Sequence, residues 1–423
     1  MADALLDQQE EEPTGDGMFT SGGSLHVALM AGGDKPYAVP LASSLISHGV
    51  TLDVIGSDEL DAPELHQHPL LRFLNLRGDV RPDVAILSKV LRILIFYGRL
   101  LRYAARTKAK IFHILWNNRF ELLDRTLLLL YYRVLGKRIA FTAHNVNERR
   151  RDGNDTLLNR LSLKIQYRLV DYAFVHTEKM KRELQTDFGV PDHKISIIPF
   201  GINDCLPNTA LTPVQAKQRL ALAPSHKIAL FFGRIAPYKG LEYLVEAMAT
   251  LAKTDPECCL LIAGCAENCG YWEEIQQRIS RLGLRAKVIE QIGFVPDEEA
   301  ELYFKAADVL VLPYTEIFQS GVLFSGYAFG LPVIASDVGS FREDVIEGKT
   351  GYICRARDPE DLAAALRNYF NGDLYAHLEK RRSQIVDYVR QHHSWETVGE
   401  ITCKVYASLM ADKAAVPYTE QVA

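Results

Sequence analysis

The sequence lacks any apolar run long enough to cross a bilayer. The best candidate, Leu127–Tyr132, has six residues, where roughly 20 are needed. It also lacks the start of a secretory signal, because its first 20 residues are acidic and polar. We therefore expect a cytoplasmic protein in which residues 1–20 form a disordered tail.

Metal-binding spacing is missing as well. Cys258 and Cys259 fall in an apolar strand-like run, where a free cysteine acts as a small hydrophobic residue. Cys265 and Cys269 have no second pair to complete a zinc site. No DxD-type carboxylate pair for Mg²⁺ stands in a suitable loop. We expect no metal, no cofactor, and structural thiols at all seven cysteines: 205, 258, 259, 265, 269, 354 and 403.

Positive charge is concentrated in one segment, although the whole chain carries a formal charge of −5. Residues 89–168 contain 18 Lys and Arg against 5 Asp and Glu. Within them, the spacing of Arg92, Arg99 and Arg102 predicts one basic face on a helix rich in Leu and Ile. Such a helix is typical of proteins that lie on anionic membranes. The alternative is a surface helix that packs on the domain core.

A nucleic-acid partner is not expected, because the pI is only about 6.2 and the basic segment contains no recognition motif.

The order of apolar runs predicts two α/β domains. Short strand-like runs alternate with helical patterns, which is typical of parallel sheets covered on both faces. The pattern restarts after residue 225, so the fold class is two doubly wound, Rossmann-like domains with ligands in the cleft between them. The expected strands are 25–30, 51–55, 111–115, 139–142, 172–176, 195–199, 228–232, 258–263, 288–292, 309–312, 333–335 and 351–354.

The division of the chain follows from this pattern. We expect a first domain at 21–204, a linker rich in Pro, Asn and Thr at 205–225, and a second domain at 226–390. Residues 391–423 form a helix and a tail, and the sequence leaves open whether the helix crosses back onto the first domain.

The segment Phe231–Gly240 predicts an anion site. A strand-like run ends in Gly233, and a helical pattern begins near Leu241. Free backbone N–H groups and the positive end of a helix meet at such a turn. Arg234 and Lys239 add two fixed positive charges. Together they predict a grip on a diphosphate that needs no metal ion, whereas the alternative is an ordinary turn with two solvated bases.

Several further motifs accompany this turn. Together they resemble those of GT-B glycosyltransferases, and they are most similar to those of glycosyltransferase family 4. The likeness covers roughly residues 25–370. In order, the motifs are Met30-Ala31-Gly32-Gly33, Thr142-Ala143-His144-Asn145, Pro199-Phe200-Gly201-Ile202, Gly233-Arg234 with Lys239-Gly240, Gly293-Phe294-Val295-Pro296, Gly330 to Ser336 and Lys349-Thr350-Gly351.

This resemblance implies transfer of a hexose-type sugar from a nucleotide-diphosphate donor to a lipid-linked or polysaccharide-precursor acceptor. The catalytic candidates are His144, Glu316, Arg234 and Lys239. The donor-binding candidates are Gly32, Gly33, Gly233, Arg234, Lys239, Phe294, Val295, Glu316, Gln319, Ser320 and Gly321. The candidates for the acceptor or an anionic membrane surface are Arg92, Arg99, Arg102, Arg149 and Arg150.

One departure from the family pattern keeps alternatives open. The family carries two glutamates before the glycine of Gly-x-Pro-Val, but Ile317 and Ser325 occupy those positions here. Glu316 is one position away, and Phe324 stands where its partner would follow. In place of the second glutamate, the N–H groups and hydroxyl of Gln319–Gly321 are expected to bind phosphate. We expect a retaining transferase; an inverting transferase, a nucleotide-sugar epimerase and a catalytically weakened binding partner remain alternatives.

Overall fold

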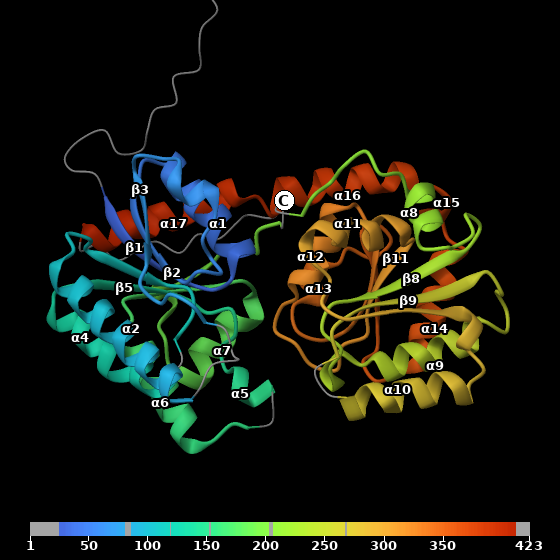
Figure 1. The fold of residues 1–423 in the computed structure, drawn as a ribbon, viewed down its shortest axis with the longest axis horizontal. Coiled ribbons are helices and arrows are strands. Elements are labelled where there is room, and N and C mark those ends of the chain that lie inside the picture. The colour runs from blue at the N-terminus through green and yellow to red at the C-terminus, as the bar shows by residue number, and fades with distance from the viewer. Residues whose placement is uncertain are drawn as a thin grey trace, which may run out of the picture.

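The chain folds into two parallel sheets, each with helices on both faces (Figure 1). The computed structural model describes residues 25–80, 86–118, 120–151, 154–202, 206–266 and 269–411. The expected tail at 1–20 and Cys205 lie outside the described residues. The predicted fold class is confirmed.

The first sheet has seven strands in the order β3-β2-β1-β4-β5-β6-β7, all paired in parallel. The strands are β1 (His26–Gly32), β2 (Thr51–Gly56), β3 (Leu71–Asn75), β4 (Ile111–Ile114), β5 (Arg138–Thr142), β6 (Tyr172–Val175) and β7 (Ile195–Ile197). The helices are α1 (Lys35–Ser47), η1 (Pro63–His66), α2 (Ile86–Arg106), α3 (Glu121–Leu123), η2 (Asp124–Leu128), α4 (Leu129–Val134), α5 (Glu148–Arg151), α6 (Leu157–Leu169), α7 (Glu178–Phe188) and η3 (Asp192–Lys194).

The second sheet has six parallel strands in the order β10-β9-β8-β11-β12-β13. The strands are β8 (Lys227–Phe232), β9 (Cys258–Gly264), β10 (Val288–Ile292), β11 (Val309–Leu312), β12 (Val333–Ser336) and β13 (Gly351–Cys354). The helices are α8 (Pro213–Arg219), η4 (Pro237–Lys239), α9 (Leu241–Leu251), α10 (Cys269–Arg281), η5 (Arg285–Lys287), α11 (Asp297–Ala306), α12 (Gly321–Ala328), α13 (Phe341–Asp344), α14 (Pro359–Phe370), α15 (Asp373–Ala376), α16 (Leu378–His392) and α17 (Trp395–Met410).

The predicted strands all appear, and the structure adds β3 at the edge of the first sheet. This strand was missed because Arg72 and Asn75 interrupt its short apolar pattern. The segment expected to be a linker contains α8, which begins with Pro213 behind a capping box between Thr212 and Gln215. Among the described residues, no helix combines the length and hydropathy needed to cross a bilayer.

Two apolar clusters cover the two faces of each sheet. On the first sheet, α1 and α17 contribute to one face, and α2, α4, α6 and α7 contribute to the other.

Four cysteines, Cys258, Cys259, Cys354 and Cys403, are free and buried, while Cys265 and Cys269 are free and exposed. The described cysteines are therefore free thiols, and the four buried ones act as small apolar side chains.

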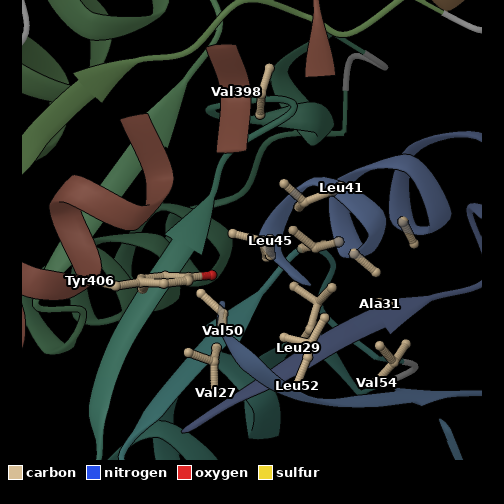
Figure 2. Close-up of a cluster of buried hydrophobic side chains, with 14 of the residues drawn as sticks. Val27, Leu29, Ala31, Leu41, Leu45, Val50, Leu52, Val54, Val398 and Tyr406 are labelled. Carbon is tan, nitrogen blue, oxygen red and sulfur yellow. The ribbon is translucent and has the colours of Figure 1, made fainter. Parts of the chain in front are cut away.

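The C-terminal helix crosses back onto the first domain, which answers the question that the sequence left open. Helix α16 packs on α12 of the second domain, and α17 packs on α1 of the first. Val398 and Tyr406 of α17 join the apolar cluster formed by β1, β2 and α1 (Figure 2). Helices α17 and α1 approach closely at Gly399, where a Cβ atom would lie 2.0 Å from the Ser44 hydroxyl oxygen.

The crossing is fixed where the chain leaves the first domain. The Trp395 ring lies against Gly201, where an added Cβ would be 2.2 Å from Cε2 of the ring. Its indole N–H donates to the Ile202 carbonyl at 2.8 Å. Further along α17, the Tyr406 hydroxyl lies 2.6 Å from Nδ1 of the buried His113. Glycine is required at 201 by this close approach of the indole ring.

Gly201→Ala should therefore destabilise the protein. The methyl group would overlap the Trp395 ring, and such overpacking costs about 1–3 kcal/mol. The control is Gly98→Ala on α2, where an added Cβ meets nothing within 4 Å and helix propensity favours alanine. Thermal unfolding measures both variants. Equal melting temperatures for wild type and Gly201→Ala would contradict the close packing.

Candidate functional site

The turn after β8 brings the predicted anion-binding groups together. Gly233 has φ +97°, and a Cβ atom there would lie 3.3 Å from Nζ of Lys239. Lys239 is only 5% exposed, and its ammonium group lies 5.1 Å from the centre of the Tyr314 ring. Its charge is therefore held against the backbone of the turn. This placement excludes a solvated surface lysine.

The N-terminus of α12 faces the same glycine. A Cβ on Gly233 would lie 3.5 Å from Cγ2 of Val322, in the first turn of α12. Ser320, at the N-cap of this helix, is buried. Arg234 is exposed beside the turn. Lys239 and the free amides of α12 thus direct positive charge toward one place, as a bound phosphate requires.

The loop before α12 is held from below by Gly339 and Ser340, which sequence reasoning missed. Gly339 has φ +60°, and a Cβ there would lie 2.4 Å from the Ile317 carbonyl oxygen. The Ser340 N–H donates to the Phe318 carbonyl at 3.0 Å. Glu316 is exposed on this loop, and Gln319 is half-buried.

A buried carboxyl group lies beneath the same loop. The Ser340 hydroxyl donates to the Asp344 carboxyl at 2.6 Å. Burial raises the pKa of Asp344 to about 7. No motif singled out Asp344, because its position follows only from the way α13 packs under the loop.

The predicted base-contacting loop follows β10. Phe294 is 84% exposed and Val295 is half-buried, behind Gly293 at φ +151°. An exposed aromatic ring at this position is available to a planar ligand.

His144 lies in an aromatic pocket at the carboxyl end of β5. Its ring stacks on Trp116 at 4.3 Å with an angle of 4° between the planes, and the edge of Tyr37 lies 4.6 Å away. The backbone of Gly32 approaches the same indole, because a Cβ there would lie 3.5 Å from Cβ of Trp116. Trp116 therefore joins the predicted glycine loop to the predicted catalytic histidine. Gly33 is exposed beside it.

Hydrogen bonds fix the proton on His144. Nδ1 of His176 lies 3.2 Å from the Ile198 carbonyl, which only accepts, so this nitrogen carries a proton. Nε2 of His176 lies 3.1 Å from Nδ1 of His144. Burial lowers the pKa of His176 to about 4 and that of His144 well below its usual range. Both rings are neutral, so His144 donates from Nδ1 and keeps a lone pair on Nε2.

That Nε2 atom is the chemically significant one. It is buried and has no hydrogen-bond partner among the described residues. A buried acceptor without a partner calls for a donor from a ligand or a water molecule. His176 orients His144 through this hydrogen bond.

The carboxyl ends of the two sheets meet between α7 and α13. The N–H of Glu178, which follows β6, donates to Oε2 of Glu343, which follows β12, at 3.2 Å. Phe200 stacks on Phe324 at 5.1 Å. Phe324, which stands eight residues after Glu316, is fully buried in this contact.

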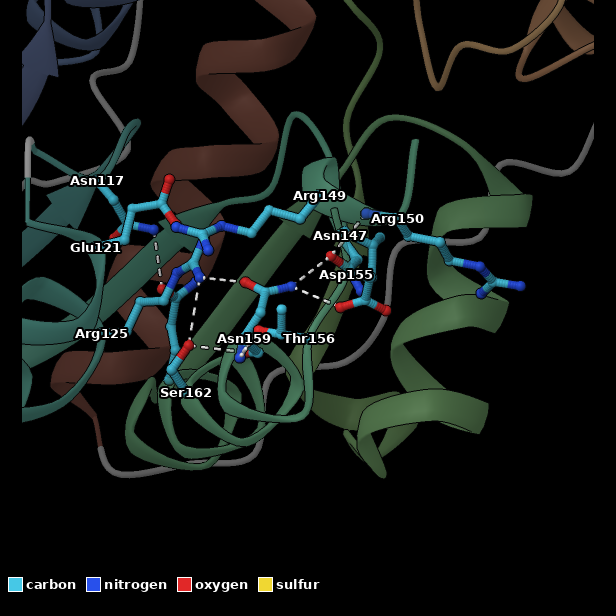
Figure 3. A network of polar contacts seen from close by, with 12 residues as sticks. Asn117, Glu121, Arg125, Asn147, Arg149, Arg150, Asp155, Thr156, Asn159 and Ser162 are labelled. Atoms are coloured by element: carbon cyan, nitrogen blue, oxygen red, sulfur yellow. Dashed lines mark hydrogen bonds and ion pairs between the residues drawn. The ribbon is translucent and has the colours of Figure 1, made fainter. Parts of the chain in front are cut away.

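Two of the predicted acceptor arginines, Arg149 and Arg150, point in different directions (Figure 3). Arg149 pairs with Glu121 at 3.2 Å, whereas Arg150 pairs with Asp187 at 3.2 Å. Glu121 also pairs with Arg125 at 3.0 Å. The Arg149 side chain therefore joins Glu121 and Arg125, whereas the Arg150 side chain pairs outside this group.

Arg125 is the buried centre of this polar network, and sequence analysis missed it. Its guanidinium donates to the Asn159 side-chain oxygen at 2.8 Å and to the Ser162 hydroxyl at 3.3 Å. Its Nε has no hydrogen-bond partner among the described residues. Arg125 lies on the π-helical turn η2; such turns are frequent at functional sites, and no motif announces them.

The remaining predicted arginines lie on α2, away from this network. Arg92 pairs with Asp79 at 3.4 Å. Arg99 donates to the Leu76 carbonyl at 3.4 Å, and Arg102 is exposed. Within the described part of the chain, no group of three or more His, Cys, Asp or Glu side chains is placed to hold a metal ion.

The buried histidines should make stability depend on pH. Burial lowers the pKa of His113 to about 3, whereas the unfolded chain protonates a histidine near pH 6.5. The stability contributed by neutral His113 is complete above pH 6.5 and is lost as the pH falls toward 3. Asp344, with its raised pKa, acts in the opposite direction between about pH 7 and its unfolded value.

His113→Gln should therefore reduce the loss of unfolding free energy between pH 7.5 and pH 5.0 by about 2 kcal/mol. Chemical denaturation at both pH values measures it. His193→Gln, at an exposed site, is the control and keeps the wild-type pH dependence. An unchanged pH dependence in His113→Gln would contradict the neutral state.

A protein-family model matches each half of the chain. Residues 31–204 match the model of Glycosyltransferase Family 4, and residues 215–392 match that of Glycosyl transferases group 1. D-inositol 3-phosphate glycosyltransferase of Corynebacterium urealyticum is 26% identical over 56% of this chain and 57% of its own length. That of Corynebacterium efficiens is 25% identical over 81% of this chain and 83% of its own. The chain spans about half the length of most curated relatives that it matches.

Solved structures share the fold at low identity. Sucrose-phosphate synthase of Thermosynechococcus elongatus superimposes with a TM-score of 0.73 and 21% identity, covering 92% of this chain and 100% of that one. Anabaena HepE, in complex with UDP and glucose, gives 0.68 and 17% over 91% of this chain and 100% of that one. These likenesses show the GT-B fold.

Proposed function

We propose that this chain, which belongs to the family of glycosyl transferases group 1, moves a hexose-type sugar from a UDP-sugar to a lipid-linked or polysaccharide-precursor acceptor. The observation that carries the proposal is the buried ammonium of Lys239, held against Gly233 where α12 begins. The UDP and glucose bound to HepE support uridine as the base. Metal-independent, retaining transfer is part of the proposal.

Charge stabilisation is the main chemical task. When the bond to the sugar breaks, negative charge grows on the leaving diphosphate. Positive groups that are already fixed in place stabilise that charge without reorganising, which is usually the largest catalytic contribution. Lys239, Arg234 and the amides of α12 from Gly321 onward supply it. Ser320 adds a hydroxyl at the same helix end, and the exposed Phe294 is available to the base.

In this proposal, His144 binds the sugar of the donor. Its neutral ring presents a lone pair at Nε2, which accepts a hydrogen bond from a sugar hydroxyl. Trp116 and Tyr37 restrict the ring, and His176 fixes its tautomer. Glu316, exposed on the loop that Gly339 supports, contributes a carboxylate for sugar hydroxyls or for positive charge at the anomeric carbon.

The acceptor belongs to the first domain in this proposal. Arg149 and Arg125 share Glu121, so one carboxylate lies between two guanidinium groups. A phosphate on the acceptor can replace this carboxylate, because guanidinium groups bind both ions through paired hydrogen bonds. The proposal also places α2, with Arg92, Arg99 and Arg102, on an anionic membrane surface.

The loss of the family's second glutamate favours one alternative, a binding partner with weakened catalysis. Ser325 occupies that position and its hydroxyl donates to the Gly321 carbonyl at 3.2 Å, so no carboxylate for a ribose stands there. Turnover decides between the two functions.

Lys239→Met should lower the rate of UDP release from a UDP-hexose about 100-fold or more, because one fixed positive charge on the leaving group is lost. Methionine keeps the length of the buried stem. Lys253→Met, at an exposed position after α9, is the control and retains the wild-type rate. A rate within threefold of wild type in Lys239→Met would exclude the diphosphate grip.

Arg149→Gln should raise the acceptor concentration needed for half-maximal rate about tenfold, with the affinity for UDP unchanged. Arg150→Gln is the matched control, because that side chain pairs with Asp187 away from the network. Steady-state kinetics with varied acceptor compare the two. Equal effects in both variants would show that Arg149 has no special role.

A further inference from the structure

The helical layer on one face of the first sheet exposes an unusual amount of apolar surface. Thirteen of the seventeen exposed large hydrophobic side chains among the described residues lie between residues 90 and 161. They belong mainly to α2, to the η2–α4 segment and to α6. Single exposed leucines are normal, whereas a concentration of this size marks an interaction surface.

The three helices lie side by side with α4 in the middle. The Tyr131 hydroxyl on α4 donates to the Leu101 carbonyl on α2 at 3.2 Å. Arg133, also on α4, donates to the Leu169 carbonyl on α6 at 2.8 Å. All three helices contribute their other faces to the same core cluster on the sheet. Their outward faces therefore form one surface, at the lower left of the ribbon in Figure 1.

Helix α2 shows that the apolar side chains point away from the core. Phe96, Tyr97 and Leu100 are buried on the sheet side, while Leu91 and Leu94 are 57% and 60% exposed. At 100° per residue, Leu91 lies on the side of the helix opposite the buried set, and Leu94 lies on the flank next to it. A helix that packs only on its own core would carry polar residues there. The alternative considered for this segment, core packing alone, leaves the outward apolar residues unexplained.

The other two helices repeat the arrangement. Leu127 is 63% exposed and Val134 is 78% exposed on η2–α4. Leu157 is 85% exposed and Leu158 is 60% exposed in the first turn of α6. These residues were not singled out by their sequence, because Leu-rich helical runs usually turn the leucines inward.

The charge on α2 and α6 has one sign. Helices α2 and α6 together contain eight Lys and Arg residues and no Asp or Glu. On α6, Arg160, Lys164 and Arg168 are all exposed. A second copy of this surface would bring like charges together, which disfavours a self-associated dimer. Anionic lipid complements both the charge and the apolar side chains.

We propose that the outward face of α2, η2–α4 and α6 is a docking surface for an anionic bilayer, with Leu94, Leu127 and Leu158 at the level of the acyl chains. The inference extends the proposed function from one helix to a three-helix surface. It rests on that function only for the reason why the protein visits a membrane. Basic side chains at the margins contact lipid phosphates, so binding weakens with salt.

The test is co-sedimentation of the full chain with vesicles of phosphatidylglycerol and phosphatidylcholine, and with vesicles of phosphatidylcholine alone. We expect binding to the anionic vesicles that falls as salt rises. A triple variant, Leu94→Glu with Leu127→Glu and Leu158→Glu, should lower the partition coefficient at least tenfold. The matched control is Val214→Glu with Leu282→Glu, two exposed apolar positions in the second domain, and it should bind as wild type.

Two further measurements separate the outcomes. Thermal stabilisation by UDP, which should be equal in wild type and triple variant, shows that the variant is folded and tests the donor site independently of the membrane. Sedimentation velocity without lipid detects self-association. Equal vesicle binding by wild type and triple variant would overturn the inference, as would a wild-type dimer that the triple variant dissociates.

Discussion

The contact between Trp395 and Gly201 is the constraint on which the arrangement of the two domains depends. Each sheet is closed by its own core clusters, and nothing within one sheet fixes the direction of the other. The indole fills the place of a side chain at 201 and binds the Ile202 carbonyl. The ring thereby joins the segment that leaves the first domain to the start of α17. Because the chain passes between the domains at two places, the carboxyl ends of both sheets stay opposed.

The same constraint explains why the histidines near this junction are neutral. Tyr37 contacts the rings of His144, His176 and Trp395 at centroid distances of 4.6 to 5.9 Å. A ring packed among other rings loses its hydration, and burial of this kind disfavours the charged form. The packing that connects the domains therefore also sets the chemical state of His144. An acceptor at Nε2, rather than a second proton donor, is the consequence.

The sequence was sufficient for the fold and for the turn after β8, because both follow from short-range rules. Apolar runs bounded by helical patterns predict parallel strands, and a glycine at the end of a strand predicts a tight turn. Edge strand β3 was missed since Arg72 breaks its pattern. Trp116, His176 and Arg125 were missed for a different reason. Their roles come from neighbours distant in the sequence, and a π-helical turn has no sequence signature.

Sequence reasoning gave two neighbouring arginines the same role, whereas the structure gives their side chains different partners. Arg149 and Arg150 are adjacent in the chain, yet one faces Glu121 and the other faces Asp187. Helix geometry accounts for this, because successive residues on a helix point about 100° apart. Spacing can place a set of residues on one face only when the helix and its phase are known. The short α5 gave the sequence no periodicity from which to read them.

In the two proposals, the first domain uses different parts of the same helices to bind the acceptor and to dock on the membrane. On α2, η2–α4 and α6, the inward faces complete the core and the outward faces are apolar and basic. Arg125 of η2 instead turns toward Asn159 and Ser162 at the start of α6, within the polar network. A lipid-linked acceptor would then leave the bilayer at the margin of this layer and meet the arginines without crossing the core. This route requires the acceptor's polar part to be long enough to reach from the apolar surface to Arg149, which favours an acceptor with a phosphate or sugar spacer over a bare lipid.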